Sequence, residues 1–322
     1  MSSQDFFAPI SDELKQVEER LYQAIETEIP ELKTASEHLL KAGGKRLRPA
    51  FALLSGAVFS NDLSPFISLA AALELVHMAT LVHDDVIDNS PTRRGTQTVK
   101  NVWGNRMSIY SGDYLFSRAL SLIAAYGRSD VVSVLAAASV QMVEGELRQL
   151  RSCFDVHQPV TEYLRRIERK TALLISLSCQ TGAMIAGASG VEVDALRRFG
   201  YYLGMAFQIT DDVLDFIADE ALLGKPTGSD IRQGVITLPA LYALRNSSER
   251  ETLARILGSA EAVSQGAEQA LELIRDSGGI EYALEVSDKY LLKAQTQLLS
   301  LPEGWARDTM TEIADFISQR EA

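Results

Sequence analysis

The 322-residue sequence predicts an all-α protein, a single large bundle of helices around a central cavity. Apolar residues recur at helical spacing, beginning with Ile10 and Leu14, and no segment alternates convincingly as a strand does. Two apolar helical runs end in matching clusters of aspartates that can face each other across one cavity. No linker, charge block or low-complexity tract divides the chain. We therefore expect one domain over residues 1–322, with residues 1–9 flexible.

Glycine and proline punctuate the helical pattern along the chain. A second helix is expected over 31–42, where Gly43 and Gly44 provide a helix C-terminal signal. The next helix, 50–58, is apolar all round and should lie inside the protein, and another starts near Ser64. The remaining elements are expected to be a loop over 90–105, helices over 106–126, 129–153, 161–187 and 193–219, a glycine-rich loop over 221–236, and shorter helices over 237–320.

The two aspartate clusters share one pattern. Asp84, Asp85 and Asp88 end the first apolar run, and Asp211, Asp212 and Asp215 end the second, in the same Asp-Asp-x-x-Asp spacing. On a helix the first and last aspartates of each cluster lie one turn apart on the same face. One such cluster alone is typical of a helix end that meets solvent. The repeat instead favours a paired site for Mg²⁺, which prefers carboxylate oxygens and substrate phosphates.

Cationic residues stand close to both clusters at bends and helix ends. Any one of them alone is typical of a solvated surface charge. Together with magnesium carboxylates, they indicate an enzyme that handles two diphosphates, because arginine forks and lysine charges both suit phosphate oxygens. The set comprises Lys45 and Arg48 after the Gly-Gly bend, Arg93 and Arg94 after the first cluster, Lys170 with Thr171 at the start of an uncharged helix, and Lys225 after the second cluster.

His77 lies seven residues before Asp84 and so on nearly the same helical face. It could equally be a core histidine with a hydrogen-bond partner. Glu74 and His77 also match half of a di-iron motif, but no other histidine has a glutamate three residues earlier, which argues against di-iron chemistry.

The composition excludes several other classes. Lys plus Arg number 31 and Asp plus Glu 43, and this net charge of −12 disfavours nucleic acid or an anionic membrane as the main partner. Residues 171–191 carry no charge, but their Ser, Gln, Thr and Gly residues are too polar for lipid, so we expect no membrane-spanning segment. No signal-peptide pattern opens the sequence. Cys153 and Cys179 lack metal-ligand spacing and suit a reducing cytoplasm.

These motifs resemble those of the trans-type isoprenyl diphosphate synthases over nearly the whole chain. The matching segments are residues 43–49, 83–88, 93–95, 112–115, 170–172, 207–215 and 224–225. Residues 163–167, 173–175 and 237–239 further resemble the catalytic component of bacterial heptaprenyl diphosphate synthase.

The resemblance implies the isoprenoid synthase fold and a role for each site residue. Two to three Mg²⁺ ions would be held by Asp84, Asp85, Asp88, Asp211 and Asp215, and the catalytic set would add Asp212 and Lys170. The allylic diphosphate would be contacted by Arg93, Lys170, Thr171, Gln208 and Lys225. Isopentenyl diphosphate would be held by Lys45, Arg48, His77 and Arg94.

The expected reaction is ionisation of an allylic diphosphate followed by attack of the isopentenyl double bond, with apolar helix walls excluding water. In this family the residue five before the first aspartate gates the product tunnel. Here it is Ala79, between Met78 and Thr80, which predicts long products. We expect a hexaprenyl to heptaprenyl product for a menaquinone side chain, built on a farnesyl or similar starter. Candidates for the tunnel floor are Phe116, Leu120 and Ile123.

The residues alone leave several alternatives open. The chain could be a short-chain farnesyl or geranylgeranyl diphosphate synthase, or a subunit that is inactive without its partner. A non-catalytic subunit could lose its aspartates, whereas this chain keeps both clusters. A terpene cyclase would not need Lys45, Arg48 and Arg94. By analogy we expect a cytoplasmic homodimer, or a heterodimer with a small regulatory component.

Overall fold

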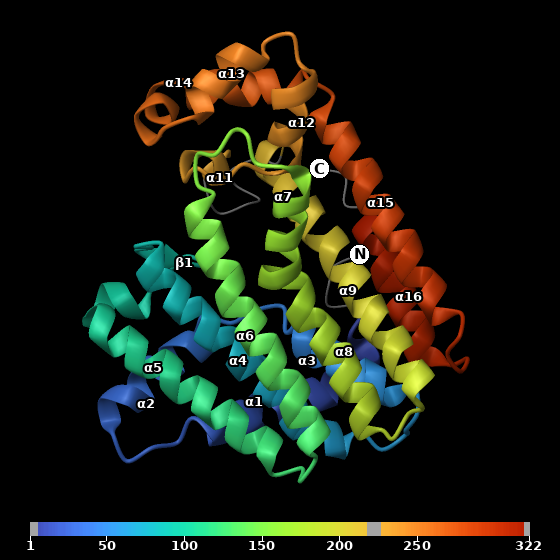
Figure 1. Cartoon of the computed structure of the whole chain (residues 1–322). Helices are drawn as coiled ribbons and strands as arrows, with labels where there is room; N and C mark the ends of the chain where they lie inside the picture. The colour runs from blue at the N-terminus through green and yellow to red at the C-terminus, as the bar shows by residue number, and fades with distance from the viewer. Residues whose placement is uncertain (1–5, 218–226, 319–322) are drawn as a thin grey trace. The chain divides into compact units, whose positions relative to one another are not determined.

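A computed structural model describes residues 6–217 and 227–318. Within these ranges the chain is helical apart from one two-stranded ladder, and it forms two compact units (Figure 1). Unit 1 comprises Met1–Ala137, Leu174–Arg197 and Ser300–Met310, and unit 2 comprises Ala138–Leu173, Arg198–Leu299 and Thr311–Ala322. Of the residues 1–9 expected to be flexible, the described ones include the buried Phe7 and the start of the first helical turn.

The all-α fold class predicted from the sequence is confirmed. The elements carried by unit 1 begin with η1 (Ala8–Ile10), α1 (Ser11–Ala24), α2 (Pro30–Lys41), α3 (Leu47–Ala57), η2 (Ser64–Phe66), α4 (Ile67–Ile87), β1 (Thr92–Arg93), β2 (Thr96–Gln97) and α5 (Val99–Ala124). The helices α6 (Ser129–Arg151), α8 (Leu173–Ile185), α9 (Gly190–Ile217) and α16 (Trp305–Ser318) pass from one unit into the other along the chain.

Helix α4 is the central helix of unit 1. Its residues from Leu69 to Val76 are all buried and, except for Glu74, apolar, and the helix packs against α1, α3 and α5. Together with η2 it forms Ser64–Ile87, the one described helix that is long and apolar enough to cross a membrane, with a mean hydropathy of 1.7. Because 67% of its most apolar window is buried inside the fold, α4 has the character of a core helix.

Two local predictions for unit 1 were wrong. Residues 90–105 were expected to be a loop, but α5 begins at Val99, where the Thr98 hydroxyl accepts a hydrogen bond from the Asn101 amide at 3.1 Å and caps the helix. Gly104, with φ of 81°, kinks α5 just before the predicted start. The short β1–β2 ladder, in which Arg93 pairs with Thr96, was also not expected because two residues are too few for an alternating pattern.

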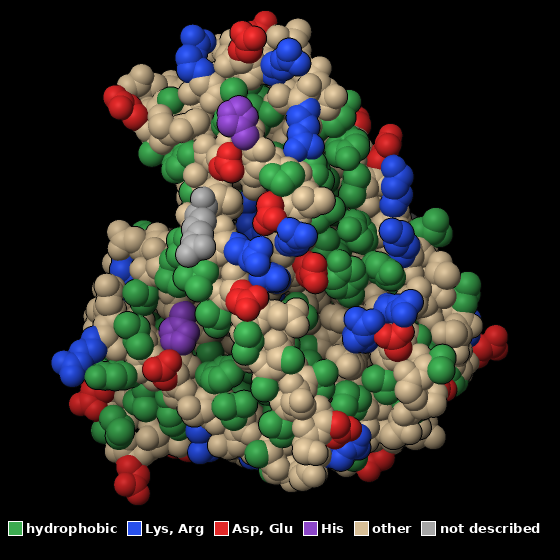
Figure 2. All heavy atoms as spheres, viewed as in Figure 1, with side chains coloured by type: hydrophobic (Ala, Val, Ile, Leu, Met, Phe, Trp, Pro, Cys, Tyr) green, Lys and Arg blue, Asp and Glu red, His purple; other side chains and the backbone are tan. Residues whose placement is uncertain are grey.

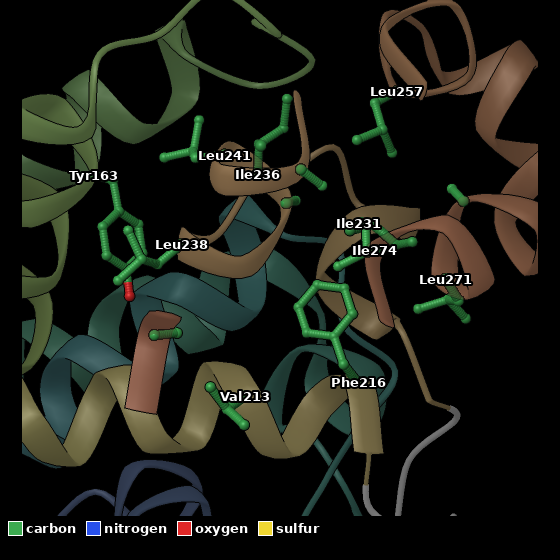
Figure 3. Packing of buried hydrophobic residues seen from close by; sticks show 14 of the residues in the cluster. Tyr163, Val213, Phe216, Ile231, Ile236, Leu238, Leu241, Leu257, Leu271 and Ile274 are labelled. Atoms are coloured by element: carbon green, nitrogen blue, oxygen red, sulfur yellow. The ribbon is translucent and has the colours of Figure 1, made fainter. Parts of the chain in front are cut away.

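Unit 2 contains the second core. Its elements are α7 (Val160–Ile167), the π-helical segment η3 (Glu168–Ala172), α11 (Ser229–Arg232), α12 (Leu238–Asn246), α13 (Arg250–Leu257), α14 (Ala260–Arg275) and α15 (Gly279–Leu298), with the adjoining parts of α6, α9 and α16. Figure 3 shows this core, in which Tyr163 of α7 lies near Leu238 of α12 and Phe216 of α9 lies near Ile274 of α14. All four side chains are essentially buried.

The helix predicted over 161–187 is interrupted rather than continuous. A π-helical stretch, which holds one more residue per turn than an α-helix, separates α7 from α8 at Glu168–Ala172. Gly204 of α9 allows close packing at this stretch, because a Cβ there would lie 2.5 Å from the Cα of Ala172. The π-helical stretch contains two predicted site residues, Lys170 and Thr171.

Candidate active site

The first aspartate cluster ends α4 in unit 1. The amide of Asp88 donates to the carbonyl of Asp84 at 2.8 Å, so these two residues lie one helical turn apart, as predicted. Asp88 is exposed and Asp84 is half-buried. Asp85 is 2% exposed and accepts an ion-pair hydrogen bond from Arg93 Nε at 2.8 Å. Burial raises the pKa of Asp85, while Arg93 acts in the opposite direction.

A tight hairpin turn positions the two arginines that come after this cluster. Thr92 pairs with Gln97 and Arg93 with Thr96, which leaves Arg94 and Gly95 as a two-residue turn. Both have positive φ, 53° and 74°, as a type I′ hairpin requires. The turn directs Arg93 to Asp85, and the Arg94 guanidinium packs against Gly44, where a Cβ would lie 3.0 Å from Arg94 Cζ.

Arg48, His77 and Arg94 form a cationic group in the same unit. The Nε of Arg48 is buried and has no hydrogen-bond partner among the described residues. Burial lowers the pKa of Arg48 to about 10, with Arg94 adding to the shift and Glu74 opposing it. Burial, followed by the charges of Arg48 and Arg94, holds the pKa of His77 well below its ordinary value. His77 is therefore a neutral imidazole beside cations, a setting that suits an anionic ligand.

Glu74 and Arg46 support this cationic group. Glu74 is 2% exposed and accepts from Arg46 Nη1 at 2.9 Å, and Arg46 also pairs with Glu18. Arg46 occupies the N-cap of α3 with φ of 49°. The Gly43–Gly44 bend and Arg46 therefore set the direction of the first turn of α3, which carries Arg48. Sequence reasoning gave neither Glu74 nor Arg46 a place at the site. Their roles depend on contacts between α1, α3 and α4 that no local pattern indicates.

Glu74 and Arg94 also line a pocket with about 460 Å³ of empty space, partly open to solvent. Its lining joins α2, α4 and the hairpin: His38, Leu39, Ala42, Gly43, Glu74, Met78, Leu81, Asp85, Arg93, Arg94, Gln97 and Thr98. His38 Nε2 lies 2.6 Å from the Gln97 carbonyl oxygen, which ties α2 to the hairpin. Unit 1 thus brings carboxylates and arginines together around one pocket at the end of α4.

The second aspartate cluster ends α9 in unit 2, and its three members differ in surroundings. Asp212 is 4% exposed and accepts from Tyr163 Oη and from Gln208 Nε2, each at 2.8 Å. Burial raises the pKa of Asp212 to about 7. Asp215 is 1% exposed, and its Oδ2 accepts from the Asp230 amide at 3.0 Å. Asp211 is half-buried.

A hydrogen-bonded chain links the π-helical segment to this cluster. Thr171 Oγ1 donates to Gln208 Oε1 at 2.6 Å, which leaves the amide nitrogen of Gln208 to donate to Asp212. Thr171, Gln208 and Asp212 therefore come together as one network, completed by Tyr163. Lys170 is exposed, with Nζ 3.5 Å from Gln149 Oε1. Lys225, the fifth predicted allylic-site residue, lies outside the described residues.

The donor set fits Mg²⁺ in its chemistry. Asp84, Asp88 and Asp211 offer carboxylate oxygens at least partly open to solvent, and Mg²⁺ keeps several waters and completes its shell with substrate phosphates. Within the described ranges, no three His, Cys, Asp or Glu side chains already converge closely enough to hold an ion by themselves. These carboxylates are therefore suited to a metal that arrives with a diphosphate.

Comparison with known proteins identifies the family. The polyprenyl synthetase family model matches residues 29–274. The chain belongs to the polyprenyl synthetase family. As a member it is a prenyltransferase, and its all-α fold is the isoprenoid synthase fold.

Three relatives of this polyprenyl synthetase cover essentially its full length. Heptaprenyl diphosphate synthase component 2 of Geobacillus stearothermophilus is 44% identical over 321 residues, covering 100% of both chains. The crystal structure of heptaprenyl diphosphate synthase from Staphylococcus aureus superposes with a TM-score of 0.91 at 39% identity, covering 97% of this chain and 99% of that one. A polyprenyl synthase from Caulobacter crescentus, complexed with calcium and isoprenyl diphosphate, gives a TM-score of 0.93 at 35% identity, covering 100% and 98%.

Proposed function

We propose that this prenyltransferase is a long-chain trans-polyprenyl diphosphate synthase, which condenses isopentenyl diphosphate head-to-tail onto a farnesyl or similar allylic diphosphate. The observation that carries the proposal is the site in unit 1, where solvent-accessible carboxylates end α4 beside the cationic group of Arg48, His77 and Arg94. Such an arrangement suits a metal-bound diphosphate and a second, metal-free diphosphate. The 44% identity to a heptaprenyl diphosphate synthase component favours a hexaprenyl to heptaprenyl product, destined for a menaquinone side chain.

The residues proposed to hold two to three Mg²⁺ ions are Asp84, Asp85, Asp88, Asp211 and Asp215. When bound, the ions would neutralise the charge that develops on the departing pyrophosphate. Asp85 in turn holds Arg93 at 2.8 Å, so the arginine is positioned to contact the same diphosphate. Asp212 acts through its neighbours, because its two hydrogen bonds fix Tyr163 and Gln208 rather than an open coordination site.

The two proposed substrate sites are formed by different sets of side chains. For isopentenyl diphosphate we propose Lys45, Arg48, His77 and Arg94, where the buried Arg48 Nε offers a donor to a phosphate oxygen. For the allylic diphosphate we propose Arg93, Lys170, Thr171, Gln208 and Lys225. Hydrogen-bond donors and cations placed where charge develops account for most of the rate enhancement in reactions of this kind. No side chain is assigned as the base that removes the final proton, and the released pyrophosphate is a plausible acceptor.

Product length is proposed to depend on the space between α4 and α5. Ala79 is 2% exposed and small, so it leaves room past the first aspartates, and Met78 beside it is flexible. On α5, Phe116, Leu120 and Ile123 lie along one helical face, and α4 and α5 pack together along their length. These three residues are the proposed floor of the tunnel.

The deciding experiment incubates the purified protein with Mg²⁺, labelled isopentenyl diphosphate and farnesyl diphosphate, and then sizes the products by chromatography. Products of 30 to 35 carbons are expected. Products that stop at 15 or 20 carbons would support the short-chain alternative instead. Activity that requires a second protein would assign this chain to a heteromeric enzyme, as the name "component 2" of its relative indicates for that protein.

An apolar stripe on α6 supports an assembly. Val140, Val143, Leu147 and Leu150 are 60%, 62%, 55% and 49% exposed, and they recur at the spacing of one helical face. A contiguous exposed apolar face of this kind is typical of a protein–protein interface. We propose that it is covered in a homodimer or in a heterodimer with a small regulatory component, in the cytoplasm.

A further inference from the structure

A group of arginines lies between α6 and α7 of unit 2, and none of these arginines is among the residues proposed for the two substrate sites (Figure 2). The groove that they form has about 250 Å³ of empty space, open to solvent. Its lining comprises Gly145, Arg148, Gln149, Ser152, Glu162, Arg165, Arg166 and Arg169. We call it the arginine groove.

The arginines differ in how far their charges are already used. Arg165 pairs with Glu162 at 2.6 Å, and Arg169 pairs with Glu144 at 3.3 Å. Arg166 is buried, donates to the Ile236 carbonyl at 2.8 Å and lies over the ring of Tyr163. Arg148 is exposed and makes no hydrogen bond or ion pair with any described residue. It is thus a charged group available to a ligand.

Cations outnumber carboxylates around the groove. Lys170 adjoins it, because its Nζ lies 3.5 Å from the lining residue Gln149. The carboxylates in reach are Glu162, Glu144, Glu168 and Asp212. Arg169 and Arg165 oppose the rise in the pKa of Glu168 that burial causes, and Arg166 does the same for Asp212. Five cations therefore meet four carboxylates on a chain whose net charge is −12. This local reversal of sign attracts an anion.

The packing of α6 against η3 shows that the groove is built into the fold. Gly145 lies inside α6, where glycine costs about 1 kcal/mol relative to alanine. A Cβ at Gly145 would lie 2.6 Å from Arg169 Cβ, so the missing side chain is what admits Arg169 to this place. Helix α6 therefore contains a glycine, which disfavours the helix, at the position where Arg169 needs the space.

From these observations we propose that the arginine groove binds a phosphate or diphosphate group without a metal ion. Arginine forks match phosphate oxygens with two parallel hydrogen bonds, and Arg148 and Arg165 are both exposed on the groove. The Ser152 hydroxyl and the Gln149 amide supply further polar groups in the lining. The ligand is a compact anion, because the cations span only about two helical turns and an extended acidic peptide would need a longer basic track.

The groove is separate from the features already assigned on α6. The apolar stripe of Val140, Val143, Leu147 and Leu150 lies along one side of the helix, and Gly145 and Gln149 lie along the other, toward α7. An anion can therefore bind in the groove when the stripe is covered by another subunit. Binding of an anion in the groove can be measured without prenyl transfer, so the test does not depend on the proposed function.

Titration calorimetry with inorganic pyrophosphate in the presence of a chelator tests the groove, because metal-dependent binding at the aspartates is then absent. The full chain carries Arg94→Gln, which weakens the proposed isopentenyl site. We expect one remaining pyrophosphate site, weakened at least tenfold when Arg148→Gln and Arg165→Gln are added. The matched control adds Arg250→Gln and Arg255→Gln, which remove the same charge from two exposed positions of α13, and should leave the affinity within twofold.

Inorganic phosphate and isopentenyl diphosphate serve as parallel probes that distinguish a single phosphate from a product or substrate diphosphate. The proposal is supported if the affinity for any of the three anions falls in the Arg148→Gln, Arg165→Gln variant but not in the α13 control. If none of the three binds, or if both pairs change the affinity equally, the proposal is wrong. Prenyl transfer by the Arg148→Gln, Arg165→Gln variant, measured in a chain that retains Arg94, reports separately on the proposed function.

Discussion

At the scale of single residues, the two aspartate clusters are alike in sequence but different in surroundings. Asp84 and Asp88 are at least partly open to solvent, whereas Asp85, Asp212 and Asp215 are buried and engaged with named partners. The identical spacing thus contains carboxylates that are open to solvent and carboxylates that are buried and already hydrogen-bonded within the protein.

Asp84→Ala should lower turnover by several orders of magnitude while the melting temperature stays within a few degrees. The reason is that Asp84 offers an oxygen to the metal that neutralises the departing pyrophosphate, but makes little contribution to the core. Steady-state assays and calorimetric melting check the two parts. Near-normal turnover would remove Asp84 from the metal site.

Asp212 should make stability depend on pH. Its pKa is raised to about 7 from an ordinary value of 3.8, so the folded protein holds a proton that the unfolded chain has lost between these values. The contribution of this group to stability is therefore present below about pH 4 and is lost as the pH rises toward 7.

Denaturant melts in a chelator from pH 4 to pH 7 measure this effect. In Asp212→Asn, which keeps the shape but cannot titrate, the fall in unfolding free energy over this range should be smaller than in the natural chain. An unchanged slope would mean that Asp212 does not carry the shift.

Tyr163→Phe should reduce the unfolding free energy by about 1–3 kcal/mol, the usual cost of leaving a buried polar partner without its hydrogen bond. Here the partner is Asp212, which loses the hydroxyl donor at 2.8 Å. Because Gln208 remains bonded to Asp212, the Michaelis constant for the allylic substrate should change less than twofold. Chemical denaturation and kinetics with farnesyl diphosphate separate the two effects.

At the scale of elements, α4 and α5 determine how far a product can extend. Ala79→Phe places a large ring on α4 at a position that is 2% exposed and that the proposed product route passes. The main product should shorten to 15 or 20 carbons, while consumption of the first isopentenyl diphosphate stays within tenfold of the natural rate. A control with Ala79→Ser, nearly the same size, should keep the long product.

The helices also show which parts of the fold could be predicted from the sequence and which could not. Apolar residues at helical spacing predicted α4 and α9, and the Gly43–Gly44 signal predicted the end of α2. Each of these is a strong local pattern. The start of α5 at Val99 was missed because Gly104 resembles a loop residue when only its neighbours are considered. The break between α7 and α8 was missed because the local sequence remains helical in character there. The close approach of Gly204 to Ala172 at the break involves another helix.

At the scale of the whole molecule, the family and the reaction class could be predicted from motifs, but the supporting contacts could not. Arg93 and Arg94 were predicted as substrate-binding residues, and that role stays a prediction. The salt bridge of Arg93 with Asp85 and the contact of Arg94 with Gly44 depend on how the hairpin folds back. Likewise, the Glu74–Arg46 pair and the Tyr163–Asp212 hydrogen bond join residues 28 and 49 positions apart. Such pairs are set by tertiary structure, which no spacing rule records.

The apolar stripe on α6 predicts the assembly state. Val143→Glu with Leu147→Glu places two charges on positions that are 62% and 55% exposed, so a folded monomer should tolerate them, whereas a buried interface should not. Light scattering after size exclusion should show a dimer for the natural chain and a monomer for the variant. A natural chain that is monomeric at all concentrations would leave the stripe for a different subunit.

The π-helical segment at Glu168–Ala172 has a consequence for how this site could be altered or could have arisen. A π-helical turn corresponds to one residue inserted into an α-helix, and each added residue rotates the N-terminal part of the helix by about 100° relative to the C-terminal part. Deleting a single residue here should restore an unbroken α-helix and rotate one part of it against the other, so that Thr171 turns away from Gln208 and Lys170 faces a new direction. The directions of these two side chains therefore depend on the presence of one extra residue in this segment.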